Sequence, residues 1–352
     1  MQTHVHVSRP IVAALLLDSS DQSILSTARF LSKKLHAPLH LVHAVRPLFS
    51  YVGSGDIVVN PYYGYESNFS DNEEKEAKAK LDAIRESIDD VEVSAEVLRD
   101  FPAEAILSFA QERHAGLIVC GVRKEDKNRN RFLSGLSTGF ALASDAEVPV
   151  LLVPLNKAID FTRPLRMLIA DNLESEGEAA LKVAISLANA LHAQQLTHVH
   201  VQDTTYGEID KMIESVRESM LKGQIPADPI LNRDFYIERV RAKTCEELQR
   251  RCHVAKSTAL NSCVYEPVVA FGHPSDEVHS ELVRNPTQIM IFGRHHLIRR
   301  KTFALGRIPY NAMIEEGVAT LVVPDSKTEA NLFMGSYETI KTRDDNLRSN
   351  PL

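Results

Sequence analysis

The sequence predicts an α/β protein with two tandem doubly wound parallel-sheet domains. Three observations predict this class: apolar runs alternate with segments of helical periodicity, the same series of segments occurs twice, and each copy closes with an apolar strand that ends in proline. Strands that are apolar along their whole length are typical of a parallel sheet buried on both faces, and the alternating helices supply the cover. With 352 residues, the chain is long enough for two such domains.

Four matched positions, which keep their order along the chain, show the duplication. The matched pairs are Asp18 with Asp171, Pro102 with Pro274, Gly121 with Gly293, and Pro154 with Pro324. The offset is 153 at the first pair (171 minus 18), 172 at the glycines (293 minus 121) and 170 at the closing prolines (324 minus 154). A repeat of this length indicates duplicated domains, and the change in offset places the extra residues of the second copy in its middle.

Each copy is expected to begin with a buried strand, at Ile11–Leu17 and at Leu165–Ala170. Apolar side chains then recur at the i, i+4, i+7 and i+11 spacing of one helix face. These stripes are Ile24, Ala28, Leu31 and Leu35 in the first copy and Ala180, Ala184, Leu187 and Leu191 in the second. Second strands are predicted to follow at Leu39–Val45 and Leu196–Val201.

The remaining elements continue the alternation of strand and helix. A second helix is predicted to start at the capping box Ser70-x-x-Glu73, after a loop over Pro47–Phe69 that lacks periodicity. The second copy has a longer insertion, about Tyr206–Asn261, whose spacing predicts two helices. Third strands (Val91–Leu98 and Cys263–Ala270), third helices opened by Pro102 and Pro274, and fourth strands and helices complete the copies. We therefore expect domains at 8–156 and 162–326 and a polar tail at 327–352.

Composition and charge exclude several classes of protein. The formal net charge of −7 argues against binding to a nucleic-acid backbone, since such proteins present a dominant basic face. No apolar stretch approaches the roughly 20 residues that a membrane span needs, and residues 1–10 lack the layout of a signal peptide. The four cysteines are scattered, which favours neither disulfides nor a zinc site. A cytoplasmic protein with neither nucleic acid nor membrane as partner is expected.

A ligand in a doubly wound sheet binds beyond the carboxyl ends of the strands, where the strand order reverses. If strands one and four are neighbours, Asp18 and Gly121 wall this crevice in the first copy, and Asp171 and Gly293 wall it in the second. The loop after each fourth strand leads into a helix, whose free amides and positive dipole end suit a phosphate. The sequence therefore predicts one ligand crevice in each copy.

This arrangement resembles the universal stress protein family, and the resemblance covers both copies apart from the insertions and the tail. The features that resemble the family are the aspartates Asp18 and Asp171, the second-strand segments Val42–Ala44 and Val199–Val201, the glycines Gly121 and Gly293, and the closing strand Pro149–Pro154. The resemblance implies an adenine nucleotide alpha hydrolase-like fold. It also implies that the closing strands pair, which here would join the copies as an internal pseudo-dimer.

ATP-binding members of that family carry Gly, two residues, Gly, nine residues, and then Gly followed by Ser or Thr. This chain has Lys124 or His296 at the middle glycine and Leu136 or Arg307 at the hydroxyl residue. A side chain at the middle position crowds a phosphate, whereas Lys124 or Arg307 could supply a charge to it. The resemblance implies ATP with magnesium as the ligand of these degenerate loops. The predicted ligand-binding residues are Asp18, Ser19, Gly121, Arg123, Lys124, Gly135, Ser137 and Thr138 in the first copy and Asp171, Gly293, His296, Gly306 and Arg307 in the second.

Several of these features also have a purely structural explanation. The basic runs Arg123–Arg131 and Arg294–Arg307 are more typical of a solvated face than of a phosphate site. His43 and His200 lie within strands and are interpreted as core or crevice histidines with a hydrogen-bond partner. Neither interpretation requires a ligand.

Three functions stay open on the sequence. The first is a stress-response protein that binds an adenine nucleotide or another small ligand and is regulatory rather than catalytic. The second is a protein-interaction scaffold with both crevices empty or filled by side chains, and the third is a slow ATPase that holds a metal with Asp18 or Asp171. The sequence contains no P-loop and no strand-borne dinucleotide fingerprint, so no catalytic residue and no metal ligand is assigned. Protein partners, a homodimer included, are not determined, and the DSS after the first strand slightly favours the first copy as the better binder.

Overall fold

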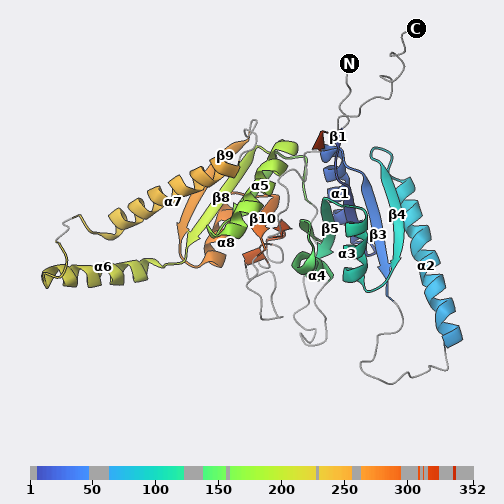
Figure 1. Ribbon diagram of the computed structural model, residues 1–352, viewed down its shortest axis with the longest axis horizontal. Helices are drawn as coiled ribbons and strands as arrows, with labels where there is room; N and C mark the ends of the chain where they lie inside the picture. Colours follow the sequence, from blue (N-terminus) through green and yellow to red (C-terminus); the bar gives the residue numbers. More distant parts are fainter. Residues whose placement is uncertain are drawn as a thin grey trace, which may run out of the picture.

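A single ten-stranded sheet runs through both halves of the chain (Figure 1). The computed structural model describes residues 6–46, 63–122, 138–155, 159–226, 230–255, 263–294, 308–309, 312, 316–324 and 336–337. The first half contributes β2 (Ile11–Ala14), β3 (Leu39–Val45), β4 (Val93–Arg99), β5 (Leu117–Val122) and β6 (Val150–Pro154). The second half contributes β7 (Arg166–Ala170), β8 (Gln195–Gln202), β9 (Val264–Phe271), β10 (Ile289–Gly293) and β11 (Ala319–Val323). We call these halves the first and second domains.

The strand order shows that the two domains have the same topology. The order across the sheet is β4-β3-β2-β5-β6-β11-β10-β7-β8-β9, so each domain reads third, second, first, fourth and fifth strand toward the centre. Neighbours within a domain are parallel, and the first strand lies beside the fourth in both: β2 pairs with β5 and β7 with β10. The predicted neighbourhood of strands one and four is confirmed, and it places the strand-order reversal where a ligand was expected.

The domains meet through their closing strands, as the family resemblance implied. β6 and β11 pair antiparallel, with Leu151 opposite Leu321. These two leucines occupy equivalent positions, 170 residues apart (321 minus 151), so an approximate twofold axis passes between them. The pairing covers two sheet edges that would otherwise be exposed, and it makes the chain an internal pseudo-dimer.

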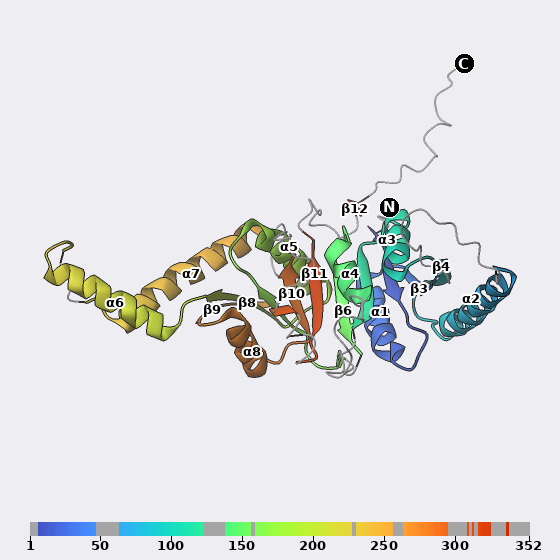
Figure 2. The same ribbon diagram turned by 90° about the horizontal axis from the view of Figure 1, so that it is seen from below.

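Helices cover both faces of the sheet (Figures 1 and 2). They are α1 (Asp21–Leu35), α2 (Tyr63–Glu86), α3 (Pro102–Glu112), α4 (Thr138–Asp145), α5 (Ser175–Ala190), α6 (Tyr206–Leu221), α7 (Arg233–Ala255) and α8 (Pro274–Arg284). Side chains of α1, α2, α5 and α7 share one continuous hydrophobic core that spans both domains. On the opposite face, α3 and α4 cover the first domain and α8 covers the second. The proline that opens α3 and the one that opens α8 stand in the first turn, where an amide has no helical partner.

The insertion of the second domain forms two helices, which confirms the prediction. Helix α6 starts at a capping box in which Thr205 and Glu208 bond each other's backbone amides. The two helices project from the sheet as a hairpin (Figures 1 and 2), joined near the sheet by a small core that includes Ile209, Ile237 and Leu248. Helix α7 contacts β9, the third strand of its domain, as α2 contacts β4 in the first domain. Helix α7 is therefore the equivalent of α2, and α6 has no equivalent among the described helices of the first domain.

Three boundaries differ from the prediction. Helix α2 begins at Tyr63, so Ser70 lies within it and does not cap it, and part of the predicted loop is helical. Residues 47–62 of that loop lie outside the described residues. Strand β2 ends at Ala14 and not at Leu17, and the Leu16 and Leu17 amides bind the Asp21 side chain instead of a neighbouring strand. Within the predicted tail, Ser336–Tyr337 (β12) pairs with His6–Val7 (β1).

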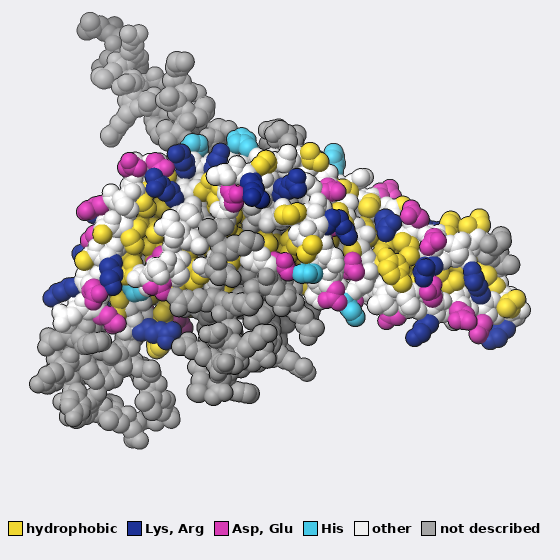
Figure 3. All heavy atoms as spheres, turned by 180° about the vertical axis from the view of Figure 1, so that it is seen from behind, with side chains coloured by type: hydrophobic (Ala, Val, Ile, Leu, Met, Phe, Trp, Pro, Cys, Tyr) yellow, Lys and Arg dark blue, Asp and Glu magenta, His cyan; other side chains and the backbone are white. Residues whose placement is uncertain are grey.

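The described surface carries charges of both signs. In Figure 3, Lys and Arg side chains are interspersed with Asp and Glu over the face that is drawn. Every described helix is too short or too polar to cross a membrane.

Candidate functional site

The loop that follows the first strand has the same shape in both domains. Strand pairing places Ala14 and Ala170 at equivalent positions, 156 residues apart (170 minus 14). The same offset relates Leu17 to Leu173, and both leucines have a left-handed backbone, with φ of 62° and 65°. It also relates His36 to His192, which are left-handed at the ends of α1 and α5. The offset of 156 therefore holds from the first strand through the first helix.

This offset corrects the predicted match between Asp18 and Asp171. The residue equivalent to Asp171 is Leu15 (171 minus 156), and the one equivalent to Asp18 is Glu174 (18 plus 156). The signal was present in the sequence, because the apolar stripes at Ile24 and Ala180 lie 156 apart (180 minus 24). Matching by residue type placed Asp171 three residues out of register.

In the first domain, a buried aspartate of helix α1 shapes this loop. Asp21 is 3% exposed, and its carboxylate accepts hydrogen bonds from the amides of Leu16 at 2.8 Å and Leu17 at 2.7 Å. Burial raises the pKa of Asp21, because loss of solvation outweighs these two hydrogen bonds. Asp18 is exposed on the same loop, and its carboxylate accepts hydrogen bonds from the amide and the hydroxyl of Ser20. The first domain therefore presents one carboxylate to solvent and buries another.

In the second domain, Asp171 is the buried carboxylate. It is 4% exposed, and it accepts hydrogen bonds from the Leu173 amide at 2.7 Å and from His198 Nε2 at 3.1 Å. A methyl group at Gly177 would overlap the Asp171 carboxylate. Gly177 is the equivalent of Asp21 (21 plus 156), so the two carboxylates fill the same space from different chain positions and both bind the left-handed leucine. The sequence placed Asp171 on the wall of an open crevice; the structure buries it.

Helix α7 completes the enclosure of Asp171. Arg251 donates to the carbonyls of Leu173 and Glu174 and lies 3.5 Å from the Asp171 carboxylate. Burial favours the neutral acid, but His198, the Leu173 amide and Arg251 together hold the pKa of Asp171 below its usual range. Tyr265 contacts His198 Nδ1 at 2.7 Å and donates to the Leu248 carbonyl. The insertion thus fills the space beside Asp171 with protein side chains.

A histidine of the second strand fixes the start of the loop in each domain. His43 Nδ1 lies 2.9 Å from the Leu15 carbonyl oxygen, and His200 Nδ1 lies 2.9 Å from the Asp171 carbonyl oxygen. These are equivalent pairs, and they confirm the interpretation of His43 and His200 as histidines with a structural hydrogen bond.

The end of β5 is closely packed on both of its faces. A methyl group at Gly121 would lie 2.5 Å from Leu155 Cδ2 and 2.9 Å from Ile24 Cδ1. On the other face, a methyl group at Gly139 would lie 3.2 Å from the Gly121 carbonyl oxygen. Both glycines therefore permit close approach, and the first turn of α4, which starts at Thr138, sits directly on the strand end. The described part of α4 therefore begins at the carboxyl edge of β5.

The structure locates only part of the predicted site. Asp18, Ser19 and Thr138 lie on the carboxyl side of the first domain's strands, and Gly293 ends β10. The predicted residues that lie outside the described residues are Arg123, Lys124, Gly135, Ser137, His296, Gly306 and Arg307. Among the described residues, no group of three His, Cys, Asp or Glu side chains is placed to hold a metal ion.

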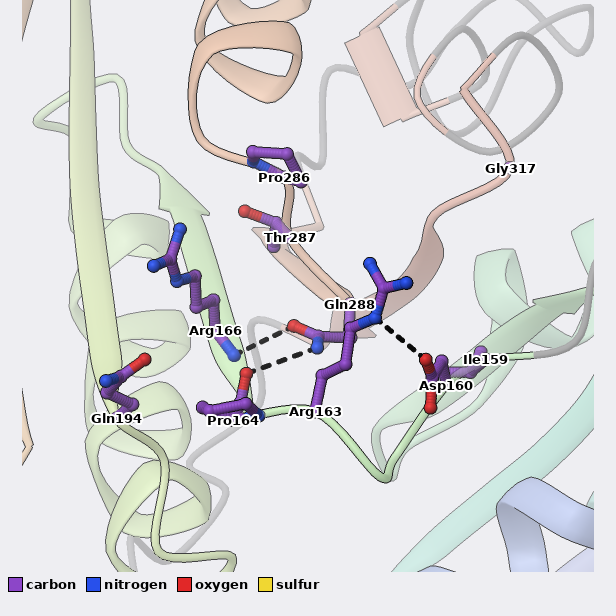
Figure 4. Close-up of a pocket in the computed structure, with 10 residues that line it drawn as sticks. All are labelled: Ile159, Asp160, Arg163, Pro164, Arg166, Gln194, Pro286, Thr287, Gln288 and Gly317. Carbon is purple, nitrogen blue, oxygen red and sulfur yellow. Dashed lines mark hydrogen bonds and ion pairs between the residues drawn. The ribbon is translucent and has the colours of Figure 1, made fainter.

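A cavity of about 380 Å³ lies at the opposite edge, where the inter-domain linker meets the second domain (Figure 4). Gln288 accepts from the Arg166 amide at 2.8 Å and donates to the Pro164 carbonyl, while Arg163 pairs with Asp160 at 3.0 Å. The carboxyl ends of helices, which repel anions, point to this side of a parallel sheet. We therefore interpret the cavity as part of the linker contact.

Two fused α/β domains, each with a doubly wound parallel sheet in which the first and fourth strands are neighbours, define the class of protein. Residues 8–154 match the model of the Universal stress protein family. Over the whole chain, a universal stress protein from Archaeoglobus fulgidus is similar at 14% identity and a TM-score of 0.56, covering 91% of this chain and 99% of that one. A functionally unknown protein from Pseudomonas aeruginosa is similar at 13% identity and a TM-score of 0.53, covering 93% of this chain and 96% of that one.

These similarities identify the family of the first domain and the fold of the whole chain. Residues 8–154 belong to the universal stress protein family, and the whole chain has the fold of a universal stress protein that it matches almost from end to end. No curated protein matches the chain by sequence.

Proposed function

We propose that this chain is a regulatory member of its family that binds ATP in the first domain, at the carboxyl ends of β2 and β5. The observation that carries the proposal is the contrast between two loops of the same shape. The first domain presents Asp18 to solvent at this edge, whereas the second domain buries Asp171 under its own side chains. The family of residues 8–154 supports a nucleotide as the ligand.

Two groups of described residues in the first domain fit such a ligand, one at its nucleoside end and one at its phosphate end. Asp18, on the loop after β2, would accept hydrogen bonds from the nucleoside. The first turn of α4, held against Gly121, would direct free amides toward the phosphates. Magnesium, when bound with ATP, would neutralise phosphate charge.

Asp171 does not fit the corresponding role in the second domain. Its carboxylate is engaged by the Leu173 amide, His198 and Arg251, and a ligand would have to displace these partners. Glu174, the residue equivalent to Asp18, is exposed, but its carbonyl is bound by Arg251. We infer that the second domain supports the first and does not bind a second nucleotide through Asp171.

The test is the affinity of the full chain for ATP with magnesium, measured by calorimetry on Asp18→Ala and on the unaltered chain. We expect about one site per chain and a roughly tenfold weaker affinity in the variant, equivalent to about 1.4 kcal/mol. Asp89→Ala is the matched control, since Asp89 is an exposed aspartate after α2, at the opposite edge of the sheet. Two ATP sites per chain would contradict the proposal, and so would an ATP affinity that Asp18→Ala leaves unchanged.

A second function, a protein-interaction scaffold, is favoured by the α6–α7 hairpin. Leu221 and Ile230, near its tip, are 88% and 57% exposed, and the hairpin extends beyond the sheet (Figure 2). Mass spectrometry of gently purified protein separates the two functions. A co-purifying adenine nucleotide supports ATP binding, whereas its absence, together with no thermal shift on adding ATP and magnesium, supports the scaffold.

A further inference from the structure

One arginine of the second domain reaches across the domain boundary to a helix of the first. Arg294 directly follows β10, and its backbone amide continues the pairing with β11 by donating to Val323 at 2.7 Å. Its Nη1 donates to the carbonyl oxygens of Ser144 at 2.8 Å and Ala146 at 2.7 Å. These carbonyls lie at the C-terminus of α4, so Arg294 contacts the helix whose other end lies at the proposed ATP site.

Helix α4 lacks the features that usually stabilise a C-terminus. The last carbonyls of a helix have no partner within the helix, and the negative end of the helix dipole favours a cation there. The last turn of α4 contains no basic residue and ends in Asp145, which is unfavourable at that end. Arg294 supplies both the missing donors and the missing charge.

The second domain also forms part of the surface on which α4 lies. Val322 of β11 is 2% exposed and belongs to the same hydrophobic cluster as Leu142, Ala143 and Ala146. At its other end, the helix rests on Gly121 through Gly139. The eight residues of α4 therefore connect the ligand edge of the first domain with the second domain.

Among the residues that the structure describes, this contact has no equivalent from the first domain to the second. The residue of the first domain that corresponds to Arg294 is Val122 (294 minus 172), whose side chain cannot donate a hydrogen bond. Val122 is 2% exposed and packs in the hydrophobic cluster of the first domain, with Leu142 of α4. The support that Arg294 provides therefore runs from the second domain to the first.

We infer that Arg294 is a positioning residue for the ATP site of the first domain. By binding the last carbonyls of α4 it holds the helix along its axis, and this keeps the first turn of the helix against Gly121 with its amides toward the phosphates. The inference rests on the proposed function. It assigns the second domain a task in an assembly where only the first domain binds nucleotide, and it gives a role to the half-buried first residue of the basic run Arg294–Arg307.

Two measurements on the full chain test the inference: amide hydrogen exchange of residues 138–146 without nucleotide, and ATP affinity by calorimetry. In Arg294→Ala we expect roughly tenfold faster exchange in this segment and roughly tenfold weaker ATP binding, the effect of losing one charged hydrogen-bond donor. Arg294→Lys keeps a cation and donors at the helix end and should recover most of both effects. The control is Arg284→Ala, which removes an arginine of α8 that pairs within its own helix.

The two measurements separate the inference from the proposed function. Unchanged exchange of 138–146 in Arg294→Ala overturns the positioning role, whatever the affinity. Faster exchange with unchanged ATP affinity shows that Arg294 holds the helix but not the site, and this also overturns it. If the unaltered chain binds no ATP, the proposed function fails, and the exchange measurement alone decides whether Arg294 supports α4.

Discussion

The loops after the first strands of the two domains have the same shape, but different residues stabilise that shape. Each contains a left-handed leucine whose amide must be bonded, and each buries one carboxylate to bond it. The first domain places that carboxylate on helix α1, at Asp21, and the second places it at the strand end, at Asp171. The comparison shows that a duplicated fold keeps the position of a charge more strictly than the position of the residue that carries it.

The partners of the two carboxylates differ in strength. Asp21 is bonded mainly by backbone amides, and burial raises its pKa. Asp171 is also bonded by His198 and Arg251, which together hold its pKa below the usual range despite burial. In the second domain the buried carboxylate is therefore bound by the side chains of a histidine and an arginine, whereas in the first domain it is bound by backbone amides. The second domain should therefore depend more on its carboxylate.

The largest effect expected from this comparison is that of Asp171→Ala. Removal of the carboxylate leaves the Nε2 atom of the fully buried His198 without its acceptor and takes the buried anion away from Arg251, which is 10% exposed. Loss of one partner from a buried pair costs about 3–5 kcal/mol, so the free energy of unfolding should fall by that amount. Urea denaturation measures the loss, and hydrogen exchange of β7 and β8 locates it.

Asp21→Ala is the matched change in the first domain. It leaves two amides without acceptors but no buried cation, and we expect a loss of about 1–3 kcal/mol. If Asp21→Ala destabilises the chain as much as Asp171→Ala, the proposed difference between the two domains is wrong.

The duplication and the doubly wound fold could be predicted from the sequence, but the interior of the site could not. The glycines Gly121 and Gly293 and the two closing strands mark equivalent strands of the two copies, because apolar runs and their terminators repeat in order. The contacts of Arg251 with Asp171 and of Arg294 with α4 join residues 80 and about 150 positions apart, and such contacts leave no periodic pattern. They arise from packing, which decides which polar groups are brought together.

The end of β2 shows the same limit at short range. Ile11–Leu17 is apolar throughout and predicts a strand to Leu17, yet the strand stops at Ala14. The amides of Leu16 and Leu17 bind the side chain of Asp21 in place of a neighbouring strand. A side-chain acceptor on the following helix thus overrides the local apolar pattern, and only the folded arrangement reveals it.

A smaller effect is expected from Gly177→Ala, which tests whether the two carboxylates fill one space. The new methyl group overlaps the Asp171 carboxylate and must displace it, at the cost of about 1–3 kcal/mol that overpacking brings. Urea denaturation measures this cost. Gly207→Ala is the control, because a methyl group there meets no atom within 4 Å and an alanine near the start of α6 is harmless.

A double substitution sharpens the same test. Asp171→Leu with Gly177→Asp gives the second domain the arrangement of the first, where Leu15 and Asp21 hold these positions. The restored carboxylate would reach the Leu173 amide and Arg251 from the helix side. We expect the double variant to be more stable than Asp171→Leu alone by about 1 kcal/mol or more, the value of a charged hydrogen bond. Equal stability would show that the two positions do not share one space.

The smallest effect expected is a difference in how the two carboxylates respond to pH, limited to about 1.4 kcal/mol per pH unit for one proton. The raised pKa of Asp21 means that the folded chain takes up a proton before the unfolded chain does. Asp21 therefore adds stability as pH falls from its folded pKa toward the unfolded value of about 3.9. The lowered pKa of Asp171 acts in the opposite sense: its stabilisation is present above about pH 3.9 and is lost as pH falls further, through the folded pKa. Urea midpoints measured between pH 7 and pH 3 test this difference. Asp21→Asn should remove the rise in stability that occurs above about pH 4 as the pH falls, and Asp171→Asn should remove the fall in stability that occurs below about pH 4. The comparison between the domains breaks if both variants change the profile in the same pH range and with the same sign.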